Sequence, residues 1–210
     1  MYPYNLLQEL AEIQNKLSKK IIKKDSFQKI ETVAVVDISF EKDNCATTAA
    51  LVMDFETLQV IEEKTLNVQI LFPYIAGFLG FREADGTVSV LKNLENNFDV
   101  LMVNGHGIMH PRGFGLASHV GLLMNMPTIG IAKQLPPGKY NFKDEGEIKY
   151  ILSEEETVGA NINRNYISIG HKISLKSAID IVLKTSVFKT PEPIRKAHIL
   201  ATETMKNKIN

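Results

Sequence analysis

The sequence predicts an α/β fold built on one mixed β-sheet with helices on its faces. A run of β-branched residues, followed by two more strand-like runs with short polar connections, predicts an antiparallel meander. Later in the chain, two compact apolar runs enclose a helix candidate, which is typical of a parallel βαβ unit with a right-handed crossover. The meander is expected at 31–40, 46–55 and 58–70, and the βαβ unit at 98–104, 114–126 and 127–133.

The remaining elements follow from apolar periodicity and from capping residues. Ser174 is a suitable N-cap for a helix that begins at the next residue, and Pro191 favours the start of the last helix. Glycines weaken the helical character of the segment after Pro73. Helices are expected at 4–23, 75–96, 175–185 and from Pro191 to about 207, and three short strands within 147–169.

Composition limits the class of protein. A length of 210 residues favours a single domain over residues 1–210. No stretch approaches the ~18 uninterrupted apolar residues of a membrane span, and the N-terminus lacks the basic start and apolar run of a signal peptide. The single cysteine, Cys45, cannot form an internal disulfide, which fits a reducing compartment. We therefore expect a cytoplasmic protein with no membrane partner, present as a monomer.

The formal net charge of zero argues against a protein that coats nucleic acid regardless of its sequence. It leaves room for an enzyme with one local basic groove. Lysines do cluster between Lys16 and Lys29, and the last twenty residues are also basic. Such runs fit a solvated helix face as well as contact with phosphate.

Polar residues stand where three buried strands are expected to end. Asp37 closes the first strand of the meander, Asn104 the next central strand, and Lys133 the strand after it. Functional groups of α/β sheets gather at the carboxyl ends of central strands, so these residues predict one shared site. The structural alternatives are a turn residue for Asp37 and a lysine at the sheet edge for Lys133.

Glu83 supplies a second carboxylate. Hydrolysis of a phosphodiester with hard divalent cations needs oxygen ligands, usually carboxylates together with the phosphate itself. Asp37 and Glu83 could provide two of these ligands, although Glu83 could equally form a surface ion pair. Lys133 could stabilise negative charge that develops at the phosphate.

The stretch VNGHGIMHPRGFG (103–115) is the most distinctive segment. Glycines flank His106, and glycine lets the backbone come close to a ligand. A helical zinc pair of His106 and His110 is excluded because Gly107 and Pro111 make a helix unfavourable, so both are expected to form hydrogen bonds.

Three further side chains have both a structural and a functional interpretation. His171 could be a surface histidine or a proton-transfer group. Tyr74 could be a core residue or could stack in the gap left by an extruded base. His198 lies within a helical pattern and, like His119, is interpreted as structural.

Taken in order, these segments resemble the endonuclease V family over nearly the whole chain. ETVAVVDISF resembles its first catalytic strand, FPYIAGFLGFRE its base-probing wedge and glutamate, and ISIGHKISL and PEPIRKAHI its C-terminal signatures. VNGHGIMHPRGFGLASHVG followed by PTIGIAKQL is the most specific portion. The resemblance implies a ribonuclease H-like fold and hydrolysis, dependent on Mg²⁺ or Mn²⁺, of the phosphodiester one nucleotide 3′ of an inosine in DNA, with RNA also open.

The resemblance also implies roles for single residues. Asp37 and Glu83 match metal-binding carboxylates, and Lys133 and His171 match polar partners around the scissile phosphate. Nucleic-acid contacts are expected from the wedge turn and from the pocket for inosine. These contacts are Pro73, Tyr74 and Gly77 in the turn, and Gly105 and His110 in the pocket loop.

The sequence departs from the family pattern at two positions. Asn104 stands where the family has a metal-binding aspartate, which removes a negative charge from the cation's ligands and predicts weak metal binding and slow or absent cleavage. Ala76 replaces a second proline of the wedge and makes the turn less rigid. Three interpretations remain: an active nuclease, an inosine-binding protein that does not cut, and a protein that binds a free nucleotide. The wedge motif argues against the third.

Overall fold

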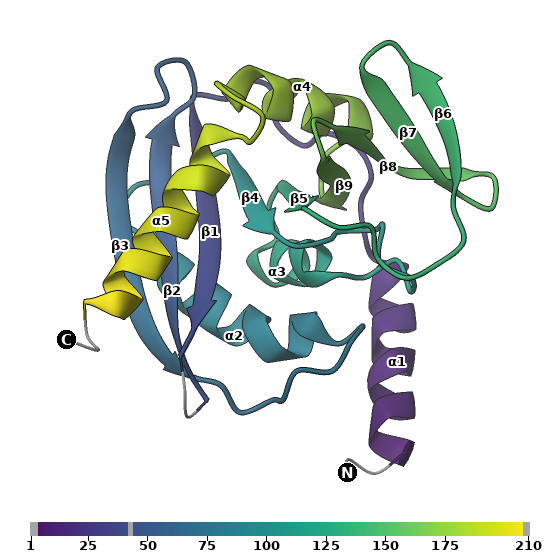
Figure 1. Ribbon diagram of the computed structural model, residues 1–210, viewed down its shortest axis with the longest axis horizontal. Coiled ribbons are helices and arrows are strands. Elements are labelled where there is room, and N and C mark those ends of the chain that lie inside the picture. Colours follow the sequence, from purple (N-terminus) through teal and green to yellow (C-terminus); the bar gives the residue numbers. More distant parts are fainter. Residues whose placement is uncertain (1–3, 42–43, 208–210) are drawn as a thin grey trace.

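The fold is a single continuous sheet of nine strands in the order β3-β2-β1-β4-β5-β9-β8-β7-β6. The computed structural model describes residues 4–41 and 44–207 (Figure 1). The strands are β1 Thr32–Phe40, β2 Cys45–Asp54, β3 Val60–Gln69, β4 Val100–Asn104, β5 Thr128–Ala132, β6 Asn141–Glu145, β7 Ile148–Ser153, β8 Glu156–Ile162 and β9 Asn165–His171. The helices are α1 Tyr4–Ser18, α2 Leu79–Lys92, α3 Leu116–Met124, α4 Leu175–Thr185 and α5 Glu192–Lys206.

The predicted combination of an antiparallel meander and parallel strands is confirmed. β2 pairs antiparallel with both β1 and β3, whereas β4 pairs parallel to β1 and β5 pairs parallel to β4. β9 then runs antiparallel to β5, and the later strands continue as antiparallel hairpins. This is the ribonuclease H-like mixed sheet that the resemblance implied.

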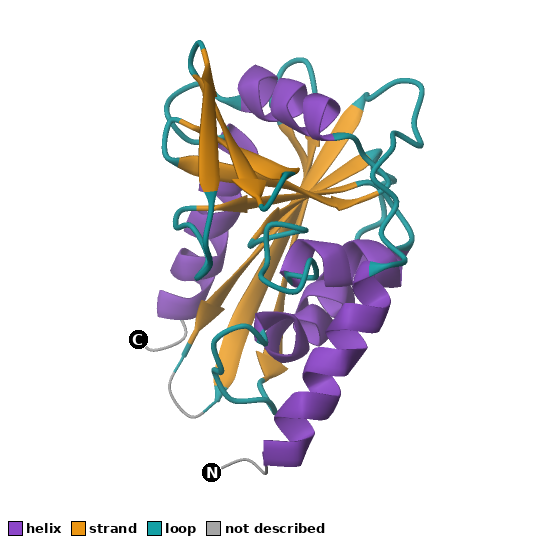
Figure 2. Cartoon of the chain, turned by 90° about the vertical axis from the view of Figure 1, so that its right-hand side faces the viewer, coloured by secondary structure: helices purple, strands orange, loops and turns teal. Residues whose placement is uncertain are grey.

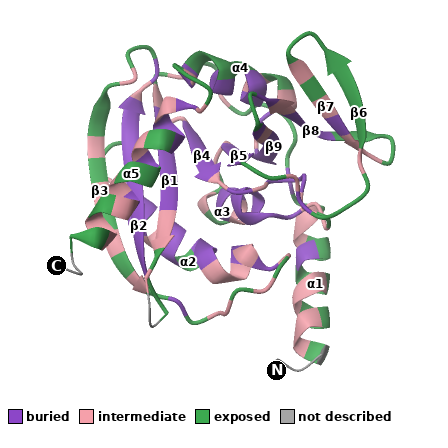
Figure 3. Ribbon diagram, in the orientation of Figure 1, coloured by how far each residue is buried: buried purple, intermediate pink, exposed green. Residues whose placement is uncertain are grey.

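Helices cover both faces of the central strands. Val33 and Val35 belong to a core that α4 and α5 cover, whereas Ala34 and Val36 pack with α2 and α3. The two layers are visible edge-on in Figure 2. β1 and β4 are therefore buried on both sides, while the outer strands β3 and β6 are largely exposed (Figure 3). Burial on both sides explains why β1 and β4 are apolar runs rather than alternating ones.

Most predicted elements are present, with differences at their ends. The last two helices start as predicted, and the Ser174 hydroxyl caps α4 by accepting from the backbone N–H of Ser177. The helix predicted at 75–96 begins only at Leu79, because Ala76 and Gly77 form a turn in which the backbone N–H of Phe78 donates to the carbonyl of Ile75. The helix predicted at 4–23 ends at Ser18. β6 was not predicted, since its five residues are all exposed and mostly polar.

Asp37 requires a correction. It was expected to end its strand, but β1 continues to Phe40, with Asp37 paired to Ala49 of β2. Its carboxylate is therefore held inside the sheet rather than on a turn. Within the described ranges, no helix is long and apolar enough to cross a membrane.

Glycines let the loop after β4 fold back across the sheet. The backbone N–H of Gly105 donates to the carbonyl of Ile131, and that of Ile108 donates to the carbonyl of Ile169. On the sheet side, a Cβ at Gly130 would lie 2.5 Å from the backbone nitrogen of Gly107 and 2.7 Å from the carbonyl oxygen of Gly105. The backbone of β5 at Gly130 thus packs directly against the backbone of the loop at Gly105 and Gly107, and any side chain at position 130 would separate them.

Gly130→Ala is expected to lower the free energy of unfolding by about 1–3 kcal/mol, because backbone on both sides must move. Urea unfolding measures the change. The control is Gly86→Ala, where the new methyl meets side-chain atoms of Val68 and Thr48 at 3.0 and 3.3 Å and alanine favours the helix. Equal effects of the two substitutions would contradict this account of the loop.

Candidate active site

The three predicted polar positions lie on one face of the sheet. The residue two positions before each of them packs in the core under α4 and α5; these residues are Val35, Met102 and Ile131. Side chains two apart in a strand point to the same face. Asp37, Asn104 and Lys133 therefore project toward α4 and α5, near the carboxyl ends of β4 and β5.

Asp37 is the centre of a polar cluster. Its side chain is only 4% exposed, yet both oxygens have partners. Oδ1 accepts from Asn104 Nδ2 at 2.8 Å and from the backbone N–H of Ile38 at 2.9 Å, and Oδ2 lies 2.9 Å from His198 Nδ1. Such contacts satisfy the hydrogen-bonding capacity of a buried carboxylate and fix its orientation.

Glu83 brings a second buried carboxylate to Asp37. It lies on α2, is 4% exposed, and is close enough to Asp37 for their charges to repel. Burial, together with this repulsion, raises the pKa of Glu83 to about 8. Two carboxylates that oppose each other's ionisation in a buried place provide the donor oxygens that a hard divalent cation prefers.

The third oxygen-bearing side chain beside Asp37 is an amide. Among residues 4–41 and 44–207, no three histidine, cysteine, aspartate or glutamate side chains form a metal-binding group. Asn104 instead offers one neutral oxygen, and its NH₂ group is the part that faces Asp37. The donor set therefore fits a divalent cation in the type of its ligands, but it has one negative charge fewer than a third carboxylate would give.

His198 is a site residue that the sequence interpretation missed. It was interpreted as a residue of a helix face, which is where it lies, on α5. α5 packs along β1, with Ser39 Oγ 3.2 Å from Thr202 Oγ1, and this packing brings the imidazole to Asp37. His198 lies in PEPIRKAHI, one of the C-terminal segments that carry the resemblance, but the crossing of α5 over β1, which no local pattern reveals, places it beside Asp37.

His171 does not join this cluster, and we correct that prediction. It ends β9 opposite Thr128, the first residue of β5, whereas Asn104 pairs with Ile131 at the other end of β5. The two positions are thus separated by roughly 10 Å along the strands. His171 is 2% exposed, and its Nδ1 accepts from the backbone N–H of Ile22 at 3.3 Å. His171 therefore holds the segment that follows α1 against the end of β9.

Lys133 follows β5 and is held by two oxygen acceptors. Its Nζ donates to Asn165 Oδ1 at 2.6 Å and to Thr190 Oγ1 at 2.8 Å. Partial burial lowers its pKa from the usual range. The ammonium group is therefore positioned near the carboxyl end of β5.

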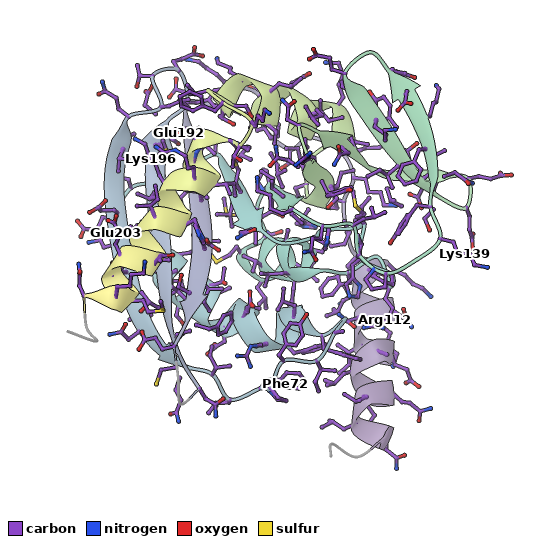
Figure 4. All side chains as sticks on the ribbon, viewed as in Figure 1. Phe72, Arg112, Lys139, Glu192, Lys196 and Glu203 are labelled. Atoms are coloured by element: carbon purple, nitrogen blue, oxygen red, sulfur yellow. The ribbon has the colours of Figure 1, made fainter. Side chains whose placement is uncertain are left out.

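The turn between β3 and α2 is fixed at its C-terminal end. Gly77 has a φ of 81°, in the left-handed region, and its carbonyl oxygen accepts from three side chains. Gln14 Nε2 and His110 Nε2 lie 3.2 and 3.0 Å from it, and Arg112 Nη2 also donates to it. Arg112 reaches the turn from beside α1 (Figure 4). Tyr74, three residues before Gly77 in the chain, is 72% exposed.

A cavity of about 600 Å³ opens between this turn and the glycine-rich loop. Its lining includes Tyr74, Gly77, His106, His110 and Pro136. Pro73 and Gly105 lie next to lining residues in the chain, Gly105 buried and Pro73 half-buried. The cavity is therefore bordered by an exposed aromatic ring on one side and by glycine backbone on the other.

Both histidines of the cavity are neutral at physiological pH. Burial lowers the pKa of His106 and that of His110 to about 4 each. His110 Nδ1 accepts from the backbone N–H of Arg112 at 3.2 Å, so Nε2 carries the hydrogen and donates to Gly77. His106 Nδ1 is buried and has no hydrogen-bond partner among the described residues, which leaves one polar atom of the cavity wall unsatisfied.

In the absence of divalent cations, the free energy of unfolding is expected to fall as pH rises. Unfolding returns the pKa of Glu83 to about 4.5, so between that pH and about 8 the folded protein holds a proton that the unfolded chain releases. The slope approaches at most about 1.4 kcal/mol per pH unit. Urea unfolding in a chelator at several pH values should show this decline, and Glu83→Gln should flatten it. The same change at exposed Glu9 should leave the decline in place; a decline that survives Glu83→Gln would contradict the assignment.

Comparison with known sequences gives consistent matches to one family. The sequence model of the Endonuclease V family matches residues 15–199. The chain is 41% identical to Endonuclease V of Dictyoglomus thermophilum, covering 94% of this chain and 90% of that protein. It is 37% identical to Endonuclease V of Pyrococcus abyssi, with 98% and 94% covered.

Solved structures agree with these sequence matches. The catalytic domain of human Endonuclease V superposes with a TM-score of 0.90 at 28% identity, covering 99% of this chain and 98% of that one. Endonuclease V of Ciona intestinalis, solved in complex with DNA that contains an inosine, superposes with a TM-score of 0.82 at 27% identity, covering 99% of this chain and all of that one. On these grounds the chain belongs to the endonuclease V family of nucleases.

Proposed function

We propose that this chain binds DNA containing an inosine and hydrolyses the phosphodiester one nucleotide 3′ of it, slowly because of Asn104. The observation that carries the proposal is the pair of buried carboxylates, Asp37 and Glu83, at the same sheet edge as a cavity bordered by exposed Tyr74. The Ciona intestinalis relative, crystallised with inosine-containing DNA, supports the choice of substrate.

The residues that would hold Mg²⁺ or Mn²⁺ are Asp37 and Glu83, with Asn104 as a neutral third ligand. A bound divalent cation would neutralise phosphate charge and make water more acidic. Burial and, after it, repulsion from Asp37 raise the pKa of Glu83, so ionising both carboxylates together is costly without an added positive charge. Such a pair favours a cation.

The chain's own side chains would position the substrate. Tyr74 would stack in the gap left by the inosine, and the cavity behind it would take the extruded base. The low cost of opening a weakened base pair adds to the selectivity. Lys133 would stabilise negative charge at the phosphate, and His198 would hold Asp37 in one orientation.

Asn104 hinders this site in two ways. It lacks the negative charge of a carboxylate. Its amide Nδ2 also donates a hydrogen bond to Asp37 Oδ1, the oxygen that a cation would use. To offer its own oxygen, Asn104 must turn its amide and give up that bond. This observation also favours a second candidate function, an inosine-binding protein that does not cut.

A nicking assay on a labelled inosine-containing duplex, with Mg²⁺ or Mn²⁺, tests the proposal. The chain should cut slowly one nucleotide 3′ of the inosine, and Asn104→Asp should cut at least about tenfold faster, since a full ligand charge returns. Because an Asn–Gly step can deamidate, the mass of the intact protein is checked first. Tight binding without cutting by the chain, with cutting by Asn104→Asp, would establish the second candidate; neither binding nor cutting by either protein would refute both.

Tyr74→Ala is expected to weaken binding of an inosine duplex on the order of tenfold, because one aromatic stack on the nucleic acid is lost. Tyr74 is exposed, so folding should not change. Fluorescence anisotropy without divalent cations measures binding separately from cutting. The matched control is Phe142→Ala, an exposed ring on β6. Equal affinities of the Tyr74 and Phe142 variants would contradict the wedge role.

A further inference from the structure

A second group of basic and aromatic side chains gathers where β5 ends and β9 begins. Its centre is Asn165, which is 2% exposed, and its outer members are Lys133, Arg164, Phe188 and Lys189. We call this group the Asn165 patch. None of these outer residues has been assigned a role except Lys133.

Asn165 fastens three segments together. Its Oδ1 accepts from Lys133 Nζ, while its Nδ2 donates to the carbonyl oxygen of Lys189 at 2.5 Å and to that of Ile162 at 3.1 Å. Lys133 also binds Thr190. The loop between α4 and α5 is thereby tied to the end of β5 by Lys133 and to the start of β9 by Asn165, so the backbone beside Phe188 is held against the sheet.

The outer face of the patch has the character of a nucleic-acid contact. Phe188 is 75% exposed, although exposure of a large apolar ring to water is unfavourable. Among the described residues, Lys133, Arg164 and Lys189 form no ion pair with a carboxylate, whereas the nearby Lys184 pairs with Glu56. Unpaired cations around an exposed ring match the combination that single-stranded nucleic acid requires, phosphate contacts with a stacking surface.

The position of the Asn165 patch relative to the carboxylates and the cavity determines which segment of a bound DNA strand would contact it. Asp37 on β1 and Asn104 on β4 project from the same sheet face, and the patch lies farther along the sheet, at the end of β5 and the start of β9. The cavity with Tyr74 lies against α2 and the loop before α3, the elements of the opposite face. A strand whose inosine occupies the cavity would pass the carboxylates and reach the patch after the cleaved bond.

We propose that the Asn165 patch binds the DNA segment on the 3′ side of the cleaved phosphodiester, with Phe188 stacking on an unpaired base and Arg164 and Lys189 contacting phosphates. The inference rests on the proposed function, because the direction of the strand follows from the proposed cut on the 3′ side of an inosine held in the cavity. The patch would hold the leaving 3′ segment in place independently of the wedge.

Binding without divalent cations tests the inference, using two inosine oligonucleotides. One ends a single nucleotide 3′ of the inosine, and the other extends well beyond it. Phe188→Ala should weaken binding of the long oligonucleotide on the order of tenfold and leave the short one unchanged. The double variant Arg164→Gln, Lys189→Gln should reduce the slope of log affinity against log salt by about 1.5, from two lost phosphate contacts.

Matched controls separate the patch from general effects. Phe142→Ala removes an exposed ring elsewhere, and Lys92→Gln removes an exposed charge at the end of α2. Both should bind as the unchanged chain does. If the chain prefers inosine but the patch variants match the controls on the long oligonucleotide, the patch inference is overturned while the proposed function stands. If the unchanged chain shows no preference for inosine, the proposed function fails and the inference falls with it.

Discussion

The arrangement of this protein depends on a carboxylate buried inside a β-sheet. Asp37 lies within β1 rather than at its end, so β2, β4 and α5 all approach it. A buried charge is tolerated only with partners, and here an amide, a backbone N–H and an imidazole supply them. His198 reaches Asp37 only because α5 lies across β1. The packing of the last helix therefore also determines which side chains surround the carboxylate.

Local patterns were sufficient to predict most of the strands and helices, and the mixed sheet with them, but not the exposed strand β6. The β-branched run that became β1 and the Ser174 cap that starts α4 are signals carried by neighbouring residues. The contact of His198 with Asp37 spans 161 positions, and the separation of His171 from the site depends on strand register. Neither is encoded in a short stretch, so the sequence could suggest a histidine at the site but not which one.

The wedge turn shows how tertiary contacts offset a local change. Ala76 removes a rigid residue, which the sequence interpretation took as a loss of stiffness. The carbonyl of Gly77 nevertheless accepts from Gln14, His110 and Arg112, which come from α1 and from the loop after β4. The guanidinium of Arg112 also stacks 4.5 Å above the Phe78 ring. Hydrogen bonds from distant segments therefore restrain a turn whose own sequence is less rigid.

We infer that Asn104 leaves the proposed cation site of Asp37 and Glu83 intact in shape but short of one negative charge. Titration with Mn²⁺, followed by the paramagnetic resonance signal of the free ion, tests it directly without any nucleic acid. The account predicts one weak site in the chain, at least about tenfold tighter binding in Asn104→Asp, and loss of the site in Asp37→Asn. Equal affinity of the chain and of Asn104→Asp, or a site that survives Asp37→Asn, would contradict it.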